Sequence, residues 1–175
     1  MKKILAVCIL VLLLASCSNT EPNDSEKSAG GTNADTIETE QVSSAFVCEL
    51  KGGAIITVGA DAESIISSLG QYVDYSEAPS CVHEGSDKVY TYTGYSVMTS
   101  PGESGEFIAQ VNIITDEEAL ANGITIGSAR SDVIAAYGEC SDEQFGIMKY
   151  DVGGAVITFV TENDAVLSIS IGAKN

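Results

Sequence analysis

The segment Gly123-Ile-Thr-Ile-Gly-Ser-Ala-Arg-Ser-Asp-Val-Ile-Ala-Ala-Tyr-Gly138 decides the fold, because the chain carries nearly the same pattern earlier. The earlier copy reads Ile56-Thr-Val-Gly-Ala-Asp-Ala-Glu-Ser-Ile-Ile-Ser-Ser-Leu-Gly70 and aligns without a gap. Each copy has a short apolar run, a glycine turn, a small polar residue suited to capping, and a stretch closed by glycine in the αL position. Such repetition predicts a domain built from two related halves.

Both copies show helical spacing after the glycine turn. In the first copy the apolar residues fall at i, i+3, i+4 and i+7, and the second copy has a comparable set. These residues are Ala62, Ile65, Ile66 and Leu69, then Ala129, Val133, Ile134 and Tyr137. We therefore predict helices over 61–69 and 128–137, each with one apolar stripe that packs on a sheet.

The other ordered segments read as strands. Two apolar runs, 45–50 and 54–58, flank Lys51-Gly52-Gly53 and predict a hairpin. Three strands are predicted after each helix, at 89–92, 95–98 and 107–114, then at 147–150, 156–160 and 166–171. The segment 71–87 reads as irregular. The prediction is an α+β domain over 45–175, with halves at about 54–115 and 121–172 and one antiparallel sheet of roughly six to eight strands.

The N-terminus has the pattern of an export signal. Two lysines precede the apolar run Ile4 to Leu14, which is short for a membrane span, and Leu14-Ala15-Ser16-Cys17 follows. These four residues resemble the lipobox of bacterial lipoproteins. The resemblance implies a signal peptide over 1–17, cleavage before Cys17, lipidation of that cysteine, and an outward-facing position at the cell membrane. An uncleaved signal anchor is the alternative. Polar, acidic residues 18–44 predict a disordered tether.

Acidic residues dominate the composition, with 25 Asp and Glu against 8 Lys and Arg and a net charge of −17. Loss of Lys2 and Lys3 with the leader would leave 6 basic residues and a balance of −19. This charge argues against nucleic acid and against an anionic membrane surface as partners, apart from the lipid anchor itself. Cationic peptides, basic protein faces and divalent cations remain open, as does a simple solubilising role.

Three cysteines, Cys48, Cys81 and Cys140, remain outside the leader. They allow at most one internal disulfide, for which Cys81 is the strongest candidate and the partner stays open. His83, the only histidine, lies two residues after Cys81. No recognised protease signature surrounds this pair, so we interpret them as a structural cysteine and a surface histidine.

The sequence carries no catalytic or cofactor motif. Acidic clusters at 116–118, 142–143 and 162–164 fall at turns or links and read as solvated, without the spacing of a calcium loop. Zinc would need a second histidine or a Cys-x-x-Cys pair. The glycine pairs at 52–53 and 153–154 read as hairpin turns, because no phosphate-binding helix follows them. We expect no catalytic residues, no metal and no cofactor.

Tyrosines gather in the first half of the chain, at Tyr72, Tyr75, Tyr90, Tyr92 and Tyr95. Alternation along a strand places Tyr90 and Tyr92 on one face. We single out Tyr90, Tyr92 and Tyr95 as a candidate contact surface for a protein or peptide. Packing of these rings between helix and sheet would produce the same sequence.

Several segments together resemble an uncharacterised lipoprotein family of anaerobic Gram-positive bacteria. They are 69–70, 75–81, 87–92, 123–127 and 133–138, and the resemblance covers about residues 45–172. The layout is also similar to the tandem fold of β-lactamase inhibitory protein and of the small outer-membrane assembly lipoproteins. This second resemblance implies a fold and does not transfer a function.

From these features we expect a membrane-anchored, non-enzymatic binding or protein-interaction module of unknown ligand. One alternative is an envelope hydrolase with a site built from carboxylates, and another is a structural accessory of an envelope complex. A binding module predicts an exposed aromatic or apolar patch. An enzyme predicts a closed pocket with two converging carboxylates, or with His83 beside Cys81.

Overall fold

The structure is a computed structural model that describes residues 45–140 and 142–174. The predicted leader at 1–17, with Cys17, and the predicted tether at 18–44 lie outside these residues. Within the described part, no helix is both long and apolar enough to cross a membrane.

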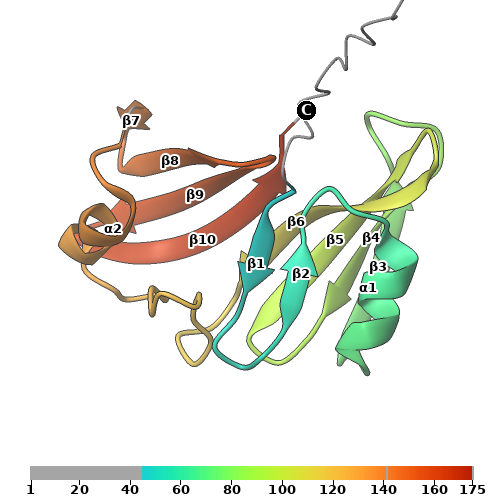
Figure 1. The fold of residues 1–175 in the computed structure, drawn as a ribbon, viewed down its shortest axis with the longest axis horizontal. Helices are drawn as coiled ribbons and strands as arrows, with labels where there is room; N and C mark the ends of the chain where they lie inside the picture. The colour runs from blue at the N-terminus through green and yellow to red at the C-terminus, as the bar shows by residue number, and fades with distance from the viewer. Residues whose placement is uncertain (1–44, 141, 175) are drawn as a thin grey trace, which may run out of the picture. The chain divides into compact units, whose positions relative to one another are not determined.

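Most of the described chain forms one eight-stranded antiparallel sheet (Figure 1). Its strand order is β3-β4-β5-β6-β10-β9-β8-β7. The strands are β3 (Asp74–Pro79), β4 (Ser86–Thr91), β5 (Tyr95–Gly102), β6 (Gly105–Ile113), β7 (Asp142–Gln144), β8 (Ile147–Val152), β9 (Ala155–Glu162) and β10 (Ala165–Ala173). A separate hairpin pairs β1 (Val47–Glu49) with β2 (Ile55–Thr57), as the sequence predicted.

The sheet has one apolar and one polar face, because alternate residues of a strand point to opposite sides. A single row of paired residues crosses seven strands on the first face: Tyr75, Tyr90, Val97, Val111, Ile171, Ile157 and Tyr150. The neighbouring row on the second face is Asp74, Thr91, Ser96, Asn112, Ser170, Thr158 and Lys149. The hydrophobic core therefore forms on the first face only.

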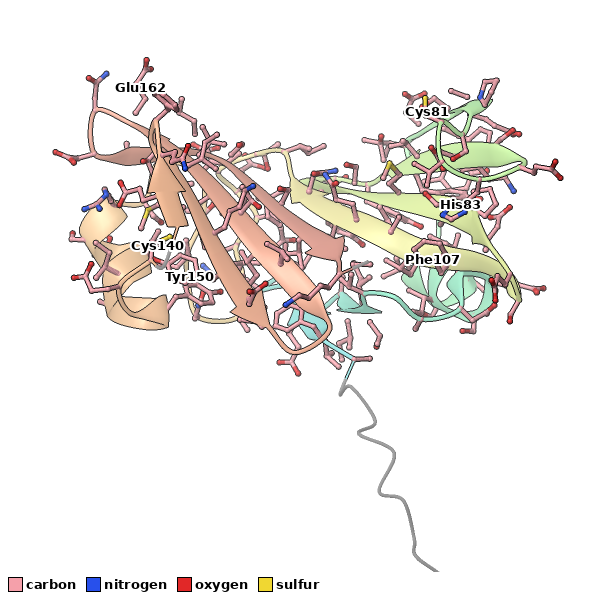
Figure 2. All side chains as sticks on the ribbon, turned by 90° about the horizontal axis from the view of Figure 1, so that it is seen from above. Cys81, His83, Phe107, Cys140, Tyr150 and Glu162 are labelled. Carbon is pink, nitrogen blue, oxygen red and sulfur yellow. The ribbon has the colours of Figure 1, made fainter. Side chains whose placement is uncertain are left out.

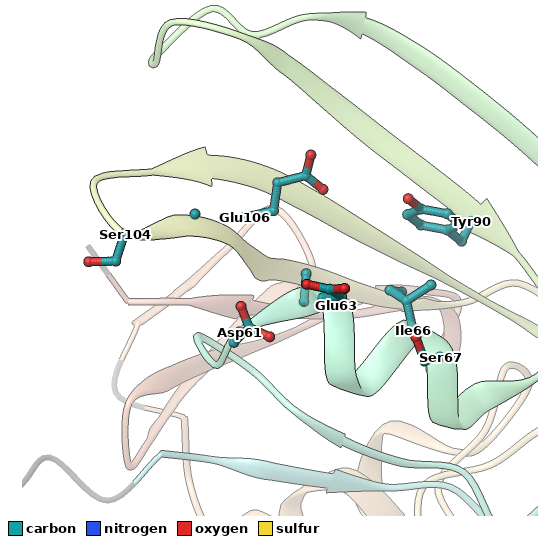
Figure 3. A pocket seen from close by; sticks show the side chains of 9 residues that line it. Asp61, Glu63, Ile66, Ser67, Tyr90, Ser104 and Glu106 are labelled. Atoms are coloured by element: carbon teal, nitrogen blue, oxygen red, sulfur yellow. The ribbon is translucent and has the colours of Figure 1, made fainter.

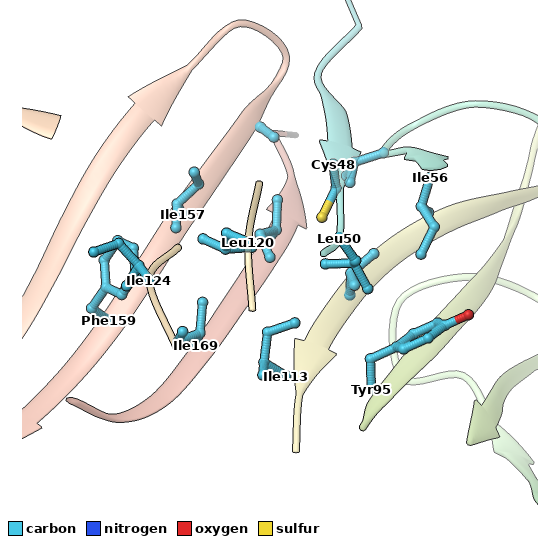
Figure 4. Packing of buried hydrophobic residues seen from close by; sticks show 14 of the residues in the cluster. Cys48, Leu50, Ile56, Tyr95, Ile113, Leu120, Ile124, Ile157, Phe159 and Ile169 are labelled. Atoms are coloured by element: carbon cyan, nitrogen blue, oxygen red, sulfur yellow. The ribbon is translucent and has the colours of Figure 1, made fainter. Parts of the chain in front are cut away.

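Two short helices, α1 (Ala62–Leu69) and α2 (Arg130–Tyr137), cover the apolar face together with the β1–β2 hairpin (Figure 2). The apolar stripe of α1 packs on the sheet as predicted, with Ala62 buried. In the second copy Val133, Ile134 and Tyr137 pack against the core, but Ala129 is exposed and precedes α2, so it does not belong to the stripe as predicted. Figure 4 shows the core between hairpin and sheet, where Cys48, Leu50 and Ile56 meet side chains of the strands.

The helix ends differ from the sequence prediction in detail. Asp61 caps α1 as predicted, and its Oδ1 accepts a hydrogen bond of 3.4 Å from the Ser64 N–H. Ser128 does not cap α2, because its hydroxyl accepts from the Thr125 N–H at 3.0 Å, so α2 begins two residues later. Gly70 and Gly138 close the helices with φ of 80° and 84°, but their ψ values of −148° and −173° lie outside αL. This backbone region is open essentially to glycine alone.

The structure thus supports the coarse prediction of two helices on a large antiparallel sheet, in a protein that is mostly β. Two edge strands were missed. All side chains of β3 are exposed, so it lacks the alternating burial pattern that identifies a strand in sequence, and 71–87 is therefore not irregular throughout. Strand β7 has only 3 residues, too few to produce a pattern.

The three cysteines occupy different environments and no disulfide joins any two of them, contrary to the candidate bridge. Cys48 is buried in the core, and Cys81 is exposed in the loop between β3 and β4. The Cys140 sulfur is half-buried and accepts from the Lys149 N–H at 3.2 Å. Figure 2 shows Cys81 and Cys140 in opposite halves of the molecule.

We predict a large difference in thiol reactivity between Cys48 and Cys81. Burial, with a smaller contribution from the Glu118 charge, raises the pKa of Cys48 to about 12, whereas Cys81 is exposed. The reactive species is the thiolate, so iodoacetamide at pH 8 should alkylate Cys48 more slowly than an ordinary exposed thiol, by more than about tenfold, because the higher nucleophilicity of a high-pKa thiolate offsets only part of its lower population. Site-resolved mass spectrometry over time measures both rates. Similar rates for the two cysteines in the native protein would contradict the buried position of Cys48.

Candidate functional site

A cleft of about 450 Å³ lies between the first half of α1 and strands β4 and β6 (Figure 3). The cap and first turns of α1 contribute Asp61, Glu63 and Ile66. Tyr90 comes from β4, and Glu106 comes from β6. The cleft exists because α1 rests on the sheet through its apolar stripe, which leaves the helix N-terminus standing beside the β5–β6 hairpin.

Three carboxylates surround this cleft, and they differ in their neighbours. Glu106 forms an ion pair with Lys88 and accepts a hydrogen bond of 3.2 Å from the Thr99 hydroxyl, so its charge is largely compensated. The hydrogen bond to Glu106 raises the pKa of Lys88, which keeps the ammonium protonated. Asp61 and Glu63 are exposed, and neither joins an ion pair within the described residues. The free negative charge of the cleft thus lies on its α1 side.

A cluster of three tyrosines, Tyr72, Tyr75 and Tyr90, continues the cleft toward the sheet edge. The ring centroids lie 5.3 Å apart for Tyr72 and Tyr90, 5.2 Å for Tyr75 and Tyr90, and 6.0 Å for Tyr72 and Tyr75. Tyr72 and Tyr75 are 47% and 39% exposed, while Tyr90 is half-buried and also lines the cleft. The cluster therefore links an exposed aromatic surface with the acidic cleft.

A fourth carboxylate, Glu77, fixes the position of one ring in this cluster. The Tyr75 hydroxyl donates a hydrogen bond of 2.7 Å to Glu77 Oε2. This bond raises the pKa of Tyr75 to about 12 and, together with the hydrogen bond from Ser86, holds the pKa of Glu77 below its usual value. The ring is thus presented in one orientation with a negative charge at its tip.

The structure places the predicted contact residues in two different environments. Tyr90 lies in the cleft, but Tyr92 and Tyr95 are 4% and 7% exposed and stack on each other at 4.9 Å. Tyr92 and Tyr95 are therefore core residues and not part of an exposed surface. Tyr90 and Tyr92 were expected on one face, and the apolar face that bears them is the face that α1 and the hairpin cover.

Sequence reasoning missed most of the cleft. Tyr75 reaches the site because β3 pairs with β4, and the unrecognised edge strand hid this. Asp61 was predicted only as the first residue of a helix. Glu106 and Lys88 meet across 18 residues of sequence, and no local pattern indicates such a pair.

The other side chains that could act as nucleophiles, bases or metal ligands lie away from the cleft or apart from one another. Cys81 and His83 share the β3–β4 loop, but the His83 ring lies against Phe107 at a centroid distance of 6.4 Å (Figure 2). No hydrogen bond joins Cys81 to His83 in the part of the chain that the structure describes. Among the same residues, no group of three or more His, Cys, Asp or Glu side chains is placed to hold a metal ion.

No family model, curated protein or solved structure matches this chain.

Proposed function

We propose that this chain is a membrane-anchored extracytoplasmic lipoprotein whose domain binds a cationic segment of a protein or peptide without catalysing a reaction. One observation carries the proposal: an exposed tyrosine cluster runs directly into a cleft with uncompensated carboxylates. Tyrosine supplies contact area at low entropic cost, and its ring attracts cations. Carboxylates beside such rings favour lysine and arginine over neutral side chains.

The charge of the whole chain supports the same partner. A net charge of −17 creates a field that speeds the approach of basic segments and repels acidic ones. The lipid on Cys17 and the tether at 18–44, as the N-terminal sequence predicts them, would hold the domain outside the cell at the membrane. Basic faces of other envelope proteins are then the partners within reach.

We further propose that the domain consists of two tandem halves, each one helix followed by a meander. The element order supports this, because α1 precedes β3 to β6 and α2 precedes β7 to β10, and the two meanders join through β6 and β10. The same layout underlies the resemblance to β-lactamase inhibitory protein, which we retain as a proposal together with the lipoprotein family.

Equivalent hydrogen bonds at the two helix starts provide independent support for the halves. The Gly59 N–H donates to the Ile108 carbonyl at 2.8 Å, and the Gly127 N–H donates to the Val166 carbonyl at 2.7 Å. In the reverse direction, the Ile108 N–H bonds to Ala60, and the Val166 N–H bonds to Ser128, both at 2.9 Å. Each glycine turn is thus tied to the last strand of its own meander.

Binding of a lysine- and arginine-rich peptide by the purified full chain tests the cleft. We expect the double variant Tyr72→Ala with Tyr75→Ala to bind at least tenfold more weakly, because truncating an aromatic anchor commonly costs more than about 1 kcal/mol. Glu63→Gln should weaken binding several-fold and reduce its salt dependence. Isothermal titration calorimetry at two salt concentrations measures both effects.

Glu162→Gln is the matched control, since Glu162 is exposed at the far end of the other half and its replacement changes the net charge equally (Figure 2). This variant should bind the peptide within twofold of the parent. If Glu63→Gln and Glu162→Gln lost the same affinity for the peptide, the binding would come from the overall negative charge of the protein and not from the cleft. A pull-down from native membranes with the tethered protein then identifies the physiological partner.

A further inference from the structure

Glu118 is a buried acid in the segment between β6 and α2. Glu118 is only 8% exposed, although the sequence predicted a solvated acidic cluster at 116–118. Its Oε1 accepts hydrogen bonds from the Gly52 N–H at 3.0 Å and from the Ala119 N–H at 2.9 Å. The carboxylate therefore closes the β1–β2 hairpin turn onto the linker between the two meanders.

This buried charge lacks a protein counter-ion. The ion pairs of the described residues join Lys88 with Glu106, Arg130 with Glu143 and Lys174 with Asp151. Within the same residues both hydrogen bonds to the Glu118 carboxylate go to Oε1, and Oε2 accepts none. Removing a carboxylate from water is costly unless its charge is compensated, and the two neutral N–H donors at Oε1 compensate it in part. Oε2 is not among the fully buried unpartnered atoms of the described residues, and Glu118 lines the neighbouring pocket.

Two glycines make the room that this carboxylate occupies. A Cβ on Gly52 would lie 2.6 Å from Glu118 Oε2, and a Cβ on Gly94 would lie 2.8 Å from Glu118 Cβ. The hairpin turn and the β4–β5 turn are thus both shaped around Glu118. Oε2 rests against Gly52, which is itself a wall of the pocket described next.

A pocket of about 580 Å³ opens beside Glu118, between the β1–β2 hairpin and the C-terminal end of α1. Its walls include Ile55 and Leu69, which are apolar, and Tyr95, whose ring is held by stacking on Tyr92 at 4.9 Å. A carboxylate, an aromatic ring and aliphatic side chains together match a positive group carried on an aliphatic chain. This pocket is separate from the cleft, which is lined by the opposite end of α1.

We propose that the pocket beside Glu118 binds a primary ammonium group at the end of an aliphatic chain. The ammonium would pair with Glu118 Oε2, and the methylene groups would lie against Leu69, Ile55 and the Tyr95 ring. A lysine side chain of a peptide and a free aliphatic diamine share this chemistry. The inference stands without the proposed function of the cleft.

Titration of the full chain with pentylamine and with pentanol, at pH 7 and followed by NMR, tests the charge requirement. Pentylamine should shift the resonances of Leu69 and Ile55, and pentanol should bind at least tenfold more weakly. Cadaverine and the peptide Gly-Lys-Gly, titrated in parallel, distinguish a free diamine from a lysine side chain, and the tighter of the two identifies the source. Equal binding of pentylamine and pentanol would overturn the proposal.

Glu118→Gln removes the charge but keeps an oxygen that accepts from Gly52 and Ala119, so the hairpin should stay closed. It should lower the affinity for pentylamine at least tenfold. Glu117→Gln is the matched control, because Glu117 is an exposed neighbour and the change in net charge is the same. Equal effects of the two variants would reject Glu118 as the ammonium partner.

A second pair of variants keeps the test valid if Glu118→Gln fails to fold. Ile55 is 61% exposed and lines the pocket, so Ile55→Lys supplies an ammonium from within the chain. This variant should no longer bind added pentylamine. Val47→Lys, at a 44% exposed position on the same hairpin, should bind it as the parent does. Retained binding in Ile55→Lys would contradict the assigned pocket.

Discussion

Replacement of Phe159 by alanine is expected to lower the free energy of unfolding by about 3–5 kcal/mol. Phe159 has no exposed surface and is the largest of the fully buried side chains of the described residues. Its ring centroid lies 5.4 Å from that of Tyr137 on α2 and 6.0 Å from that of Tyr150 on β8. Truncation therefore leaves a cavity at the contact that holds α2 on the sheet, because neighbours fixed by the sheet collapse only partly. Urea unfolding followed by circular dichroism measures the change.

Phe145→Ala is the matched control for this variant. The chemical change is identical, but Phe145 is 98% exposed in the turn between β7 and β8. Its replacement should alter the free energy of unfolding by no more than about 0.5 kcal/mol. A cost for Phe145→Ala that equalled the cost for Phe159→Ala would mean that Phe145 is covered, or that α2 does not rest on Phe159.

Gly146→Ala is expected to be the most destabilising of the glycine substitutions. Gly146 has a φ of 77°, which strains an L-residue by about 1–2 kcal/mol, and an added Cβ would lie only 2.3 Å from the Thr161 carbonyl oxygen. That atom belongs to the backbone of β9, so it cannot swing aside as a side chain would. Overpacking of this kind adds about 1–3 kcal/mol. The midpoint of urea unfolding should fall accordingly.

Gly123→Ala separates the two contributions. Gly123 has a similar φ of 87°, but an added Cβ would meet nothing within 4 Å. This variant should therefore show the backbone strain alone, about 1–2 kcal/mol. If both variants lost the same stability, the close approach of β9 to the β7–β8 turn would be absent in solution.

The sequence predicted the two helices and the central strands because these depend on local periodicity. The apolar residues of α1 repeat at helical spacing, those of α2 keep part of that pattern at Val133 and Tyr137, and strand β8 alternates between buried and exposed side chains. The edge strands escaped prediction for the same reason. A strand such as β3, exposed on both faces, has no apolar period to read, and only its pairing with β4 defines it.

The candidate sites depend on contacts between residues that are distant in the chain. Tyr75 joins Tyr90 because β3 pairs with β4, and Glu118 meets Gly52 across 66 positions. Tyr92 and Tyr95 look like the exposed tyrosines in sequence, yet both lie in the hydrophobic core. Whether a residue is buried depends on which segments pack against it, and the residues next to it in the sequence do not indicate those segments.

The sequence by itself determined the repeated helix pattern and the acidic charge, and it predicts a lipid anchor and the apolar residues available to a core. The tertiary structure decided which tyrosines remain exposed, which acidic side chains are buried, and where the cleft and the Glu118 pocket lie. The physical reason is the range of the interactions. Hydrogen bonding and periodicity act over a few residues, whereas desolvation depends on every segment that the fold brings together.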